Sequence, residues 1–423
     1  MRTFKALWMG VGVWVTALTL RAADRFPRPD FKTDYVSPDL LLPGARGPLL
    51  EWLDVAVLAA ALALAGWLAI RNRSRRGLVL LTLFSLGYFG FWRRGCVCAV
   101  GAVQNLALGW ADASCAIPLT VIAFFVLPLL ATLLVGRVFC ASVCPLGAIQ
   151  ELALWRPIKT PIWLNHTLGL LPWGYLSVAV LFAATGAGFL ICEWDPFVGF
   201  FRLGAPFHLA VTGALFLLAS LFIGRPYCRF ACPYGAILGL LSRVSRRHTT
   251  ITPDACVQCR LCEDACPYGA IRSPLPAAAP ESRATGVRRL ALILAAVPLI
   301  AVAAAATGYF FGNLLSRAHP RVALALEIHR DAAQPMSLER EAFFTSGRAT
   351  VALDAEARAI QRRFAVGGVF LGALLALTVG AQLIGLALWR SRTDYEPDRA
   401  RCFSCGRCFA YCPVGRKRKE SPK

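Results

Sequence analysis

The chain has 423 residues, of which 57% are hydrophobic and only 16% charged, and it carries a formal net charge of +21. Soluble domains average about 25% charged residues, so this composition excludes an ordinary soluble protein and indicates a membrane protein. The excess of basic residues does not indicate a nucleic-acid partner. The arginines stand mainly at the ends of apolar runs, as in residues 71–76, where they orient a membrane protein.

Eight apolar segments are each near the length of about 20 residues that crosses a hydrocarbon core. They are Ala6–Leu20, Leu53–Ile70, Leu78–Trp92, Ile117–Val135, Leu168–Ile191, Leu209–Ile223, Leu290–Phe311 and Val366–Trp389. The first segment fits a cleaved signal peptide and a retained anchor equally well. The sequence therefore predicts an α-helical integral membrane bundle of seven or eight transmembrane helices, surrounded by lipid in the bacterial inner membrane.

Alternation of these segments across the bilayer places each connecting stretch on one side. The stretches expected on the cytoplasmic side are 71–76, 136–167, 224–289 and the tail from 390, and they contain most of the short arginine-dense runs. The long outer stretch, 313–365, mixes apolar and charged residues, and we expect a small helical extracytoplasmic cap there.

A fourteen-residue pattern, G-R-x-x-C-x-x-x-C-P-x-G-A-I, occurs twice, at 136–149 and at 224–237. Each copy follows a segment predicted to run from outside to inside, so the two copies can lie side by side at the cytoplasmic membrane face. Together they supply four cysteines, enough for one iron–sulfur cluster or one zinc ion. These are Cys140, Cys144, Cys228 and Cys232. A pair of redox-inert turns is the alternative.

A second pattern, C-x-x-C-x-x-C-x-x-x-C-P, also occurs twice, at 256–267 and at 402–413. It is the spacing with which bacterial ferredoxins hold two 4Fe–4S clusters, the fourth cysteine of each motif ligating the other cluster. The last transmembrane hairpin returns the chain to the cytoplasm, so the motifs can meet as a cytoplasmic two-cluster ferredoxin-like module. We expect Cys256, Cys259, Cys262 and Cys412 around one cluster and Cys402, Cys405, Cys408 and Cys266 around the other. Zinc is the alternative, although zinc sites favour two separated C-x-x-C pairs.

The four remaining cysteines, Cys96, Cys98, Cys115 and Cys192, are all predicted to face outward. Residues 98–104 resemble a degenerate third copy of the fourteen-residue pattern, with Cys98 aligned to Cys144. A further redox centre here would complete an electron path through the bilayer. Disulfides in an oxidising compartment and thiols packed within helices are the alternatives.

The outer stretch contains Thr345–Thr350, which is faintly similar to sites where a flavin phosphate is esterified to threonine. Arg348 interrupts that pattern, so we expect no flavin on this chain. The sequence has no nucleotide-binding fingerprint and no phosphate-cradling glycine loop. An electron carrier is therefore expected, not a stand-alone enzyme.

The two C-x-x-x-C-P turns followed by the two ferredoxin-like motifs resemble the NosR/NapH-type membrane polyferredoxins, over roughly residues 78–412. The resemblance implies electron transfer between the quinone pool or a cytoplasmic donor and an extracytoplasmic reductase, as in nitrous-oxide or periplasmic nitrate reduction. The chain departs from NapH-like members because two spans separate its ferredoxin-like motifs.

The sequence thus predicts a membrane-bound iron–sulfur electron-transfer protein with two 4Fe–4S clusters and up to two further iron–sulfur centres. Its partners would be a quinone or cytoplasmic donor and a membrane or periplasmic oxidoreductase. A metalloenzyme maturation factor that supplies reducing equivalents and an iron–sulfur redox sensor are the alternatives. The expected domains are a signal or anchor segment with an outer linker (1–50), a transmembrane core (51–250), the first ferredoxin-like motif (251–285), a transmembrane hairpin (286–390) and the second motif with a basic tail (391–423).

Overall fold

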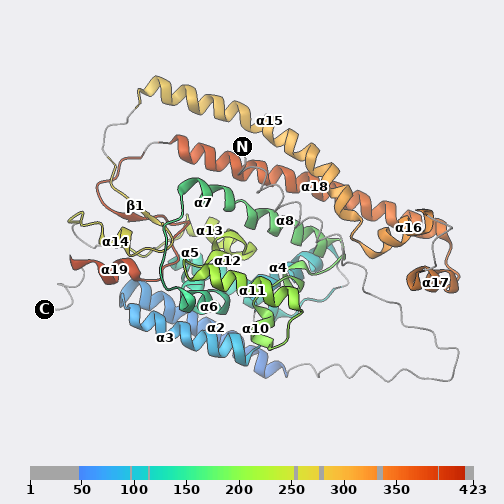
Figure 1. The fold of residues 1–423 in the computed structure, drawn as a ribbon, viewed down its shortest axis with the longest axis horizontal. Helices are drawn as coiled ribbons and strands as arrows, with labels where there is room; N and C mark the ends of the chain where they lie inside the picture. Colours follow the sequence, from blue (N-terminus) through green and yellow to red (C-terminus); the bar gives the residue numbers. More distant parts are fainter. Residues whose placement is uncertain are drawn as a thin grey trace. The chain divides into compact units, whose positions relative to one another are not determined.

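The computed structural model describes residues 47–95, 98–112, 115–251, 256–275, 281–330, 337–388 and 390–414. Within these ranges the chain is almost entirely helical, with one short two-stranded sheet (Figure 1). It divides into two compact units. Among the described residues, 184–188 and 296–377 form one, the hairpin unit, and the remainder form the other, the cysteine unit.

The cysteine unit is built mostly from short helices, several of them only half as long as a membrane span. Its α-helices are α2 (Pro48–Gly66), α3 (Arg75–Ser85), α4 (Ala99–Ala111), α5 (Leu119–Val135), α6 (Pro145–Ala153), α7 (Ile162–Leu168), α8 (Leu171–Ala184), α9 (Leu190–Glu193), α10 (Val198–Arg202), α11 (Phe207–Ser220), α12 (Pro226–Phe230), α13 (Pro233–Ser242), α14 (Leu261–Asp264) and α19 (Arg407–Tyr411). It also contains the π-helical turns η1 (Trp67–Arg71), η2 (Leu86–Trp92) and η3 (Phe139–Val143) and the strands β1 (Ile271–Arg272) and β2 (Glu396–Pro397).

A buried ion pair holds the first two described helices side by side. α2 continues into η1, the chain turns, and α3 continues into η2, so residue 93 returns to the level at which α2 begins. There Arg93 Nε lies 2.8 Å from Asp54 Oδ2, and Tyr88 donates a 2.7 Å hydrogen bond to Asp54 Oδ1. Asp54 is fully buried, and a buried carboxylate needs such a partner. This pair accounts for an arginine at the predicted outer end of a span.

Three short helices each begin directly after a cysteine. α4 follows Cys98, α6 follows Cys144 and α13 follows Cys232. α6 and α13 have proline at their first position, where the missing N–H costs no helical hydrogen bond and the fixed φ suits the helix. The C-P pair of the fourteen-residue pattern is thus a helix start that fixes a thiol at a helix N-terminus.

The hairpin unit is held by a close crossing of two long helices. It contains α16 (Pro320–Arg330) and α17 (Leu338–Thr345), most of α15 (Arg283–Ser316) and most of α18 (Thr350–Ala387). Gly308 and Gly312 of α15 face Gly368 and Gly372 of α18, and a Cβ at any of the four would overlap backbone of the opposite helix. Such small-residue spacing lets helices approach closely within a membrane.

Four helical segments of the described chain are long and apolar enough to cross a bilayer. They are Pro48–Arg71, Trp163–Ala184, Arg283–Ser316 and Thr350–Ala387. The predicted spans 117–135 and 209–223 appear as shorter apolar helices, and the predicted span 6–20 lies outside the described residues. The bundle of seven or eight spans therefore stays a prediction. α18 begins at Thr350, well before the expected start of the span at Val366, so the helix extends into the outer stretch, for which the sequence predicts a helical cap.

Candidate iron–sulfur sites

The two ferredoxin-like motifs, far apart in the sequence, form one small module in the cysteine unit. β1, which follows the first motif, pairs antiparallel with β2, which precedes the second, and Leu275 forms a further bridge with Arg392. α14 and α19, the helical turns within the two motifs, lie next to each other (Figure 1). Strand pairing outside the motifs therefore brings the two sets of cysteines together.

Two pockets in this module are each lined by four cysteines. The first thiol pocket contains Cys256, Cys259, Cys262 and Cys412, and the second contains Cys266, Cys402, Cys405 and Cys408. In both pockets three thiols come from one motif and the fourth comes from the other. The pockets measure about 280 and 320 Å³, open solvent included. The two sets are the ones expected from the sequence, whereas ligation itself remains a prediction.

Matching backbone turns aim the thiols of each motif inward. Gln258 and Arg260 in the first motif have φ of 52° and 64°, and Ser404 and Gly406, at the corresponding positions of the second, have φ of 55° and 79°. Non-glycine residues rarely adopt this left-handed conformation. Because this conformation recurs at the same two positions, the two motifs share the backbone turns that place their thiols around a pocket.

The donor set of these pockets fits an iron–sulfur cluster. Burial raises the pKa of Cys402 to about 12 and the pKa of Cys262 to about 11, so both thiols keep their protons unless a metal takes the thiolate. In the part of the chain that the structure describes, no three His, Cys, Asp or Glu side chains converge as they would around a single ion. Four cysteine thiols are the donor set that a 4Fe–4S cluster takes, and each pocket is lined by four.

The four cysteines of the fourteen-residue pattern, Cys140, Cys144, Cys228 and Cys232, form a second group, which we call the membrane-face quartet after the position that the sequence predicts for it. All four are buried and lie within electrostatic range of one another. Burial raises the pKa of Cys228 to about 12, although Arg225 and Arg137 lower it. Gln150 Nε2 also donates a 3.4 Å hydrogen bond to Cys228 Sγ.

The arginine of each copy of the pattern contacts the other copy. Arg225 of the second copy donates to the carbonyl oxygens of Cys140 and Ala141, the latter at 2.8 Å, and lies against Gly147. Arg137 of the first copy lies correspondingly against Gly235. A side chain at either glycine would collide with a guanidinium and with a carbonyl of the preceding turn. The arginine and the glycine that both copies share thus make contacts across to the opposite copy, and the two positive charges stand beside the four thiols.

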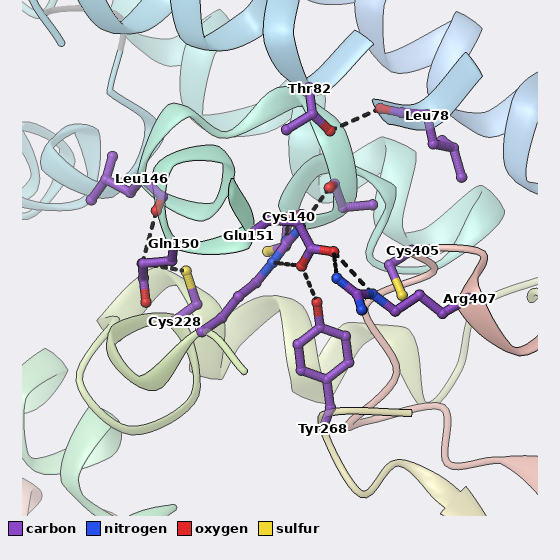
Figure 2. Close-up of polar contacts among 12 residues, drawn as sticks. Leu78, Thr82, Cys140, Leu146, Gln150, Glu151, Cys228, Tyr268, Cys405 and Arg407 are labelled. Carbon is purple, nitrogen blue, oxygen red and sulfur yellow. Dashed lines mark hydrogen bonds and ion pairs between the residues drawn. The ribbon is translucent and has the colours of Figure 1, made fainter. Parts of the chain in front are cut away.

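Glu151 joins the quartet to the second thiol pocket. Its carboxylate is 5% exposed and accepts from Arg225 at 3.1 Å, Arg75 at 2.7 Å and Arg407 at 2.9 Å. Figure 2 shows the Tyr268 hydroxyl pointing at the same carboxylate, and it donates a hydrogen bond there. Burial raises the pKa of Glu151, but the three guanidiniums outweigh it and hold the pKa below its ordinary value.

Each arginine partner of Glu151 leads to a cysteine. Arg75 donates to the Cys405 carbonyl oxygen at 2.6 Å, Arg407 lies between Cys405 and Cys408 in the chain, and Arg225 binds the Cys140 turn. The ring of Phe403, next to Cys402, lies 4.3 Å from the Arg137 guanidinium and 5.6 Å from that of Arg225. The quartet and the second pocket are thus separated by one layer of side chains.

The outer cysteines are only partly brought together. Cys98 and Cys192 interact electrostatically, and both sulfurs face Gly101. Cys115 lies at the opposite end of α4, near Gly109. Cys96 falls outside the described residues. The three described members, Cys98, Cys115 and Cys192, do not form a single group.

Sequence reasoning missed Glu151, Tyr268 and Phe403. One signal was available for the first, because the two copies of the pattern diverge directly after their shared isoleucine. The first continues Gln150-Glu151, whereas the second continues Leu238-Gly239. An acidic residue beside two buried arginines indicates a charge network, but its partners lie too far along the chain to be identified from the sequence.

Comparisons with known proteins agree with these sites. A family described as a 4Fe-4S binding domain matches residues 117–170 and 205–252, which contain the quartet. A second, also described as a 4Fe-4S binding domain, matches residues 249–272 and so contains the first ferredoxin-like motif. No solved structure matches the chain.

Several curated proteins are similar to parts of the chain. Protein MJ0750 of Methanocaldococcus jannaschii, which is uncharacterised, is 30% identical over 193 residues, or 43% of this chain and 77% of that protein. The methylamine utilization ferredoxin-type protein MauN of Paracoccus denitrificans is 27% identical over 237 residues, or 51% of this chain and 82% of MauN. YccM of Escherichia coli, an electron transport protein by its provisional name, is 30% identical over 162 residues, or 34% of this chain and 44% of YccM. The chain thus spans less than half of YccM.

Four apolar helices, 4Fe-4S domains and relatives named as ferredoxin-type proteins define a membrane iron–sulfur protein of the electron-transport class. Proteins named NapH and NosR are among its further relatives, at 30% and 31% identity. The chain belongs to the NosR/NapH-type polyferredoxin family.

Proposed function

We propose that this protein relays single electrons through three iron–sulfur centres, one in each thiol pocket and one in the membrane-face quartet. Two four-thiol pockets formed reciprocally by two motifs carry this proposal, because that exchange of the fourth cysteine is the ferredoxin arrangement. The clusters supply one-electron chemistry when bound. The chain's own residues exclude water, balance charge and fix the distances between the centres.

A gradient of burial supports an order for the relay. Cys259 in the first pocket is exposed and Cys256 is half-buried, whereas Cys402, Cys405 and Cys408 in the second pocket are buried, as is the whole quartet. A soluble donor could therefore approach the first pocket only. We propose that electrons enter there, pass to the second pocket and reach the quartet past Glu151 and Phe403.

Arginine placement supports a cytoplasmic position for the entry site. The arginine-dense segments 71–76 and 243–247 flank apolar helices on the same side as the ferredoxin-like module, as the positive-inside bias requires. The proposed location is the bacterial inner membrane, with several spans. The donor would be a cytoplasmic reductant or a quinol, and the acceptor a membrane or periplasmic oxidoreductase.

Anaerobic purification with iron and sulfide analysis and EPR spectroscopy tests this function. Two clusters correspond to about eight iron atoms per chain, and a quartet centre raises this to about twelve. Reducible EPR signals that are reoxidised by a quinone or by an outer-side reductase would support the relay. Stoichiometric zinc without a paramagnetic signal would contradict it.

A further inference from the structure

In the membrane-face quartet, one glutamine side chain connects the helix that follows one cysteine to the turn that carries another. Cys144 directly precedes α6, and Gln150 lies nearly two turns further along that helix. Gln150 Oε1 accepts a 3.0 Å hydrogen bond from the N–H of Tyr227, and its Nε2 donates to the neighbouring Cys228. One amide thus fixes the second thiol opposite the first.

The outer cysteines repeat this arrangement. Cys98 starts α4, and Gln104 stands as far along α4 as Gln150 does along α6. Gln104 Oε1 accepts a 2.8 Å hydrogen bond from the N–H of Ile191, the residue directly before Cys192. The amide of Gln104 therefore holds the Cys192 turn as Gln150 holds the Cys228 turn. The sequence alone indicates only the segment from Cys98 to Gln104, and the structure identifies Cys192 as the partner of Cys98.

A glycine completes each copy. Gly101 donates its N–H to Cys98 Sγ at 3.3 Å, and the backbone of Gly147 likewise donates to Cys144. A Cβ at Gly101 would stand 3.1 Å from Cys192 Sγ and 4.0 Å from Cys98 Sγ. Both outer sulfurs therefore lie over the same glycine, at the start of α4.

Two observations distinguish the outer copy from the quartet. Gln104 is fully buried, and its Nε2 has no hydrogen-bond partner among the described residues. Asp195 is also buried, accepts from the N–H groups of Phe197 and Val198, and lies within electrostatic range of Cys98. The positions that correspond to the other two quartet cysteines are Arg94 and Pro196. Among the described residues this site therefore has two thiols and a carboxylate, in place of the four thiols of the quartet.

The outer pair is connected to the quartet through Tyr227. This buried phenol lies within electrostatic range of both Cys232 and Cys98, and its hydroxyl has no hydrogen-bond partner among the described residues. The rings of Phe197 and Phe216 lie edge-on to it at 5.3 and 5.4 Å. A single buried aromatic side chain therefore lies within electrostatic range of both thiol groups.

We infer that Cys98 and Cys192 form a dithiol–disulfide site that reduces disulfides of an extracytoplasmic protein partner. The inference rests on the proposed electron relay. Cys192 is exposed and Cys98 is half-buried, so Cys192 is the attacking thiol and Cys98 the resolving thiol.

The reaction balances in two halves. The Cys192 thiolate attacks the partner's disulfide, releases one partner thiolate and forms a mixed disulfide. Asp195 takes the proton of Cys98, whose thiolate attacks Cys192 Sγ, so the second partner thiolate leaves and a Cys98–Cys192 disulfide forms. Two electrons from the relay and two protons then return this disulfide to two thiols.

The test uses full-length protein in lipid nanodiscs, equilibrated anaerobically in glutathione redox buffers. Remaining thiols are blocked with N-ethylmaleimide, and linked peptides are identified by mass spectrometry. We expect a Cys98–Cys192 link in oxidising buffer that disappears in reducing buffer. Cys98→Ser should instead accumulate glutathione on Cys192. Cys115→Ser, at the far end of α4, is the matched control and should behave as the wild type.

A second measurement tests the electron supply. In proteoliposomes, dithionite added only to the face that carries the ferredoxin-like module should reopen the link in the wild type, and at least tenfold more slowly in the Cys140→Ala/Cys228→Ala variant. Equal rates would overturn the inference. Failure of Cys98 and Cys192 to link in any buffer, or linkage of either to Cys115, would also overturn it. Iron and EPR measurements on the same sample separate the two proposals, because clusters without a link leave the relay standing, whereas a link without clusters overturns both.

Discussion

The ferredoxin-like module and the membrane-face quartet both bring four cysteines together, but by different means. In the module the backbone of each motif positions the thiols. Left-handed residues occur at the same two positions of both motifs, and one thiol is exchanged between the motifs. In the quartet Cys140 lies in the π-helical turn η3 and Cys228 in the short helix α12, and the thiols are held by buried side chains, chiefly Arg137, Arg225 and Gln150. The positions of the thiols are thus set by local backbone conformation in the module and by tertiary side-chain contacts in the quartet.

This difference has a consequence for redox tuning. The module's first pocket is partly open to solvent, which screens nearby charges. The quartet is buried beside two guanidiniums, where a charge acts more strongly because the local dielectric is low. We therefore expect the potential of the quartet to depend on charged side chains and that of the first pocket to depend little on them.

Removal of single cysteines should have the largest effect and should separate the two regions. Cys228→Ser should remove about four iron atoms per chain and one EPR signal, and leave the module's signals intact. Cys402→Ser should remove the second-pocket signal, and it should weaken the first as well, because both motifs share one core. Iron analysis and EPR measure both effects, with Cys115→Ser as the control. Loss of all signals in Cys228→Ser would show that the regions do not form independently.

Glu151→Gln should have the next largest effect, and it should act at the junction between the regions. The change leaves the fully buried Arg225 without its carboxylate, and breaking such a buried pair costs about 3–5 kcal/mol. Loss of one negative charge should also raise the reduction potentials of the quartet and of the second pocket more than that of the first pocket. Thermal unfolding and EPR-monitored redox titration measure these changes.

Asp264→Asn is the matched control for Glu151→Gln. Asp264 also pairs with a basic side chain, Lys159 at 2.7 Å, but both are exposed. Solvent screens such a pair, so neither stability nor potentials should change measurably. Equal responses of the two variants would contradict the role assigned to burial.

Gly147→Ala and Gly235→Ala should have the smallest effect, confined to the quartet. The added methyl group would stand 3.0 Å from the Cys140 or Cys228 carbonyl oxygen and press on the arginine of the opposite copy. Overpacking of this kind costs about 1–3 kcal/mol. The quartet's EPR signal should shift, and the module's should not. Gly174→Ala in α8, where nothing lies within 4 Å, is the control and should be neutral or stabilising.

Local spacing explains which parts of these sites were predictable. C-x-x-C-x-x-C-x-x-x-C-P gives the thiol sets of both pockets, because three thiols lie on one short loop and the fourth must point elsewhere. The repeated fourteen-residue pattern likewise indicates that Cys140 and Cys228 belong to one group. Span boundaries were less predictable, since α18 runs on through charged residues from Thr350 and no change in hydropathy marks its start.

The sequence by itself determined the electron-transport class, the helical membrane character and the cysteines that group with one another, because each of these depends on residue type and near-neighbour spacing. Only the tertiary structure decided that Glu151 connects Arg75, Arg225, Arg407 and Tyr268, and that Gln104 sets Cys192 against Cys98. Those contacts join residues from separate helices, and the energy of a buried charge or amide depends on what folding places around it. No pattern along the chain encodes that environment.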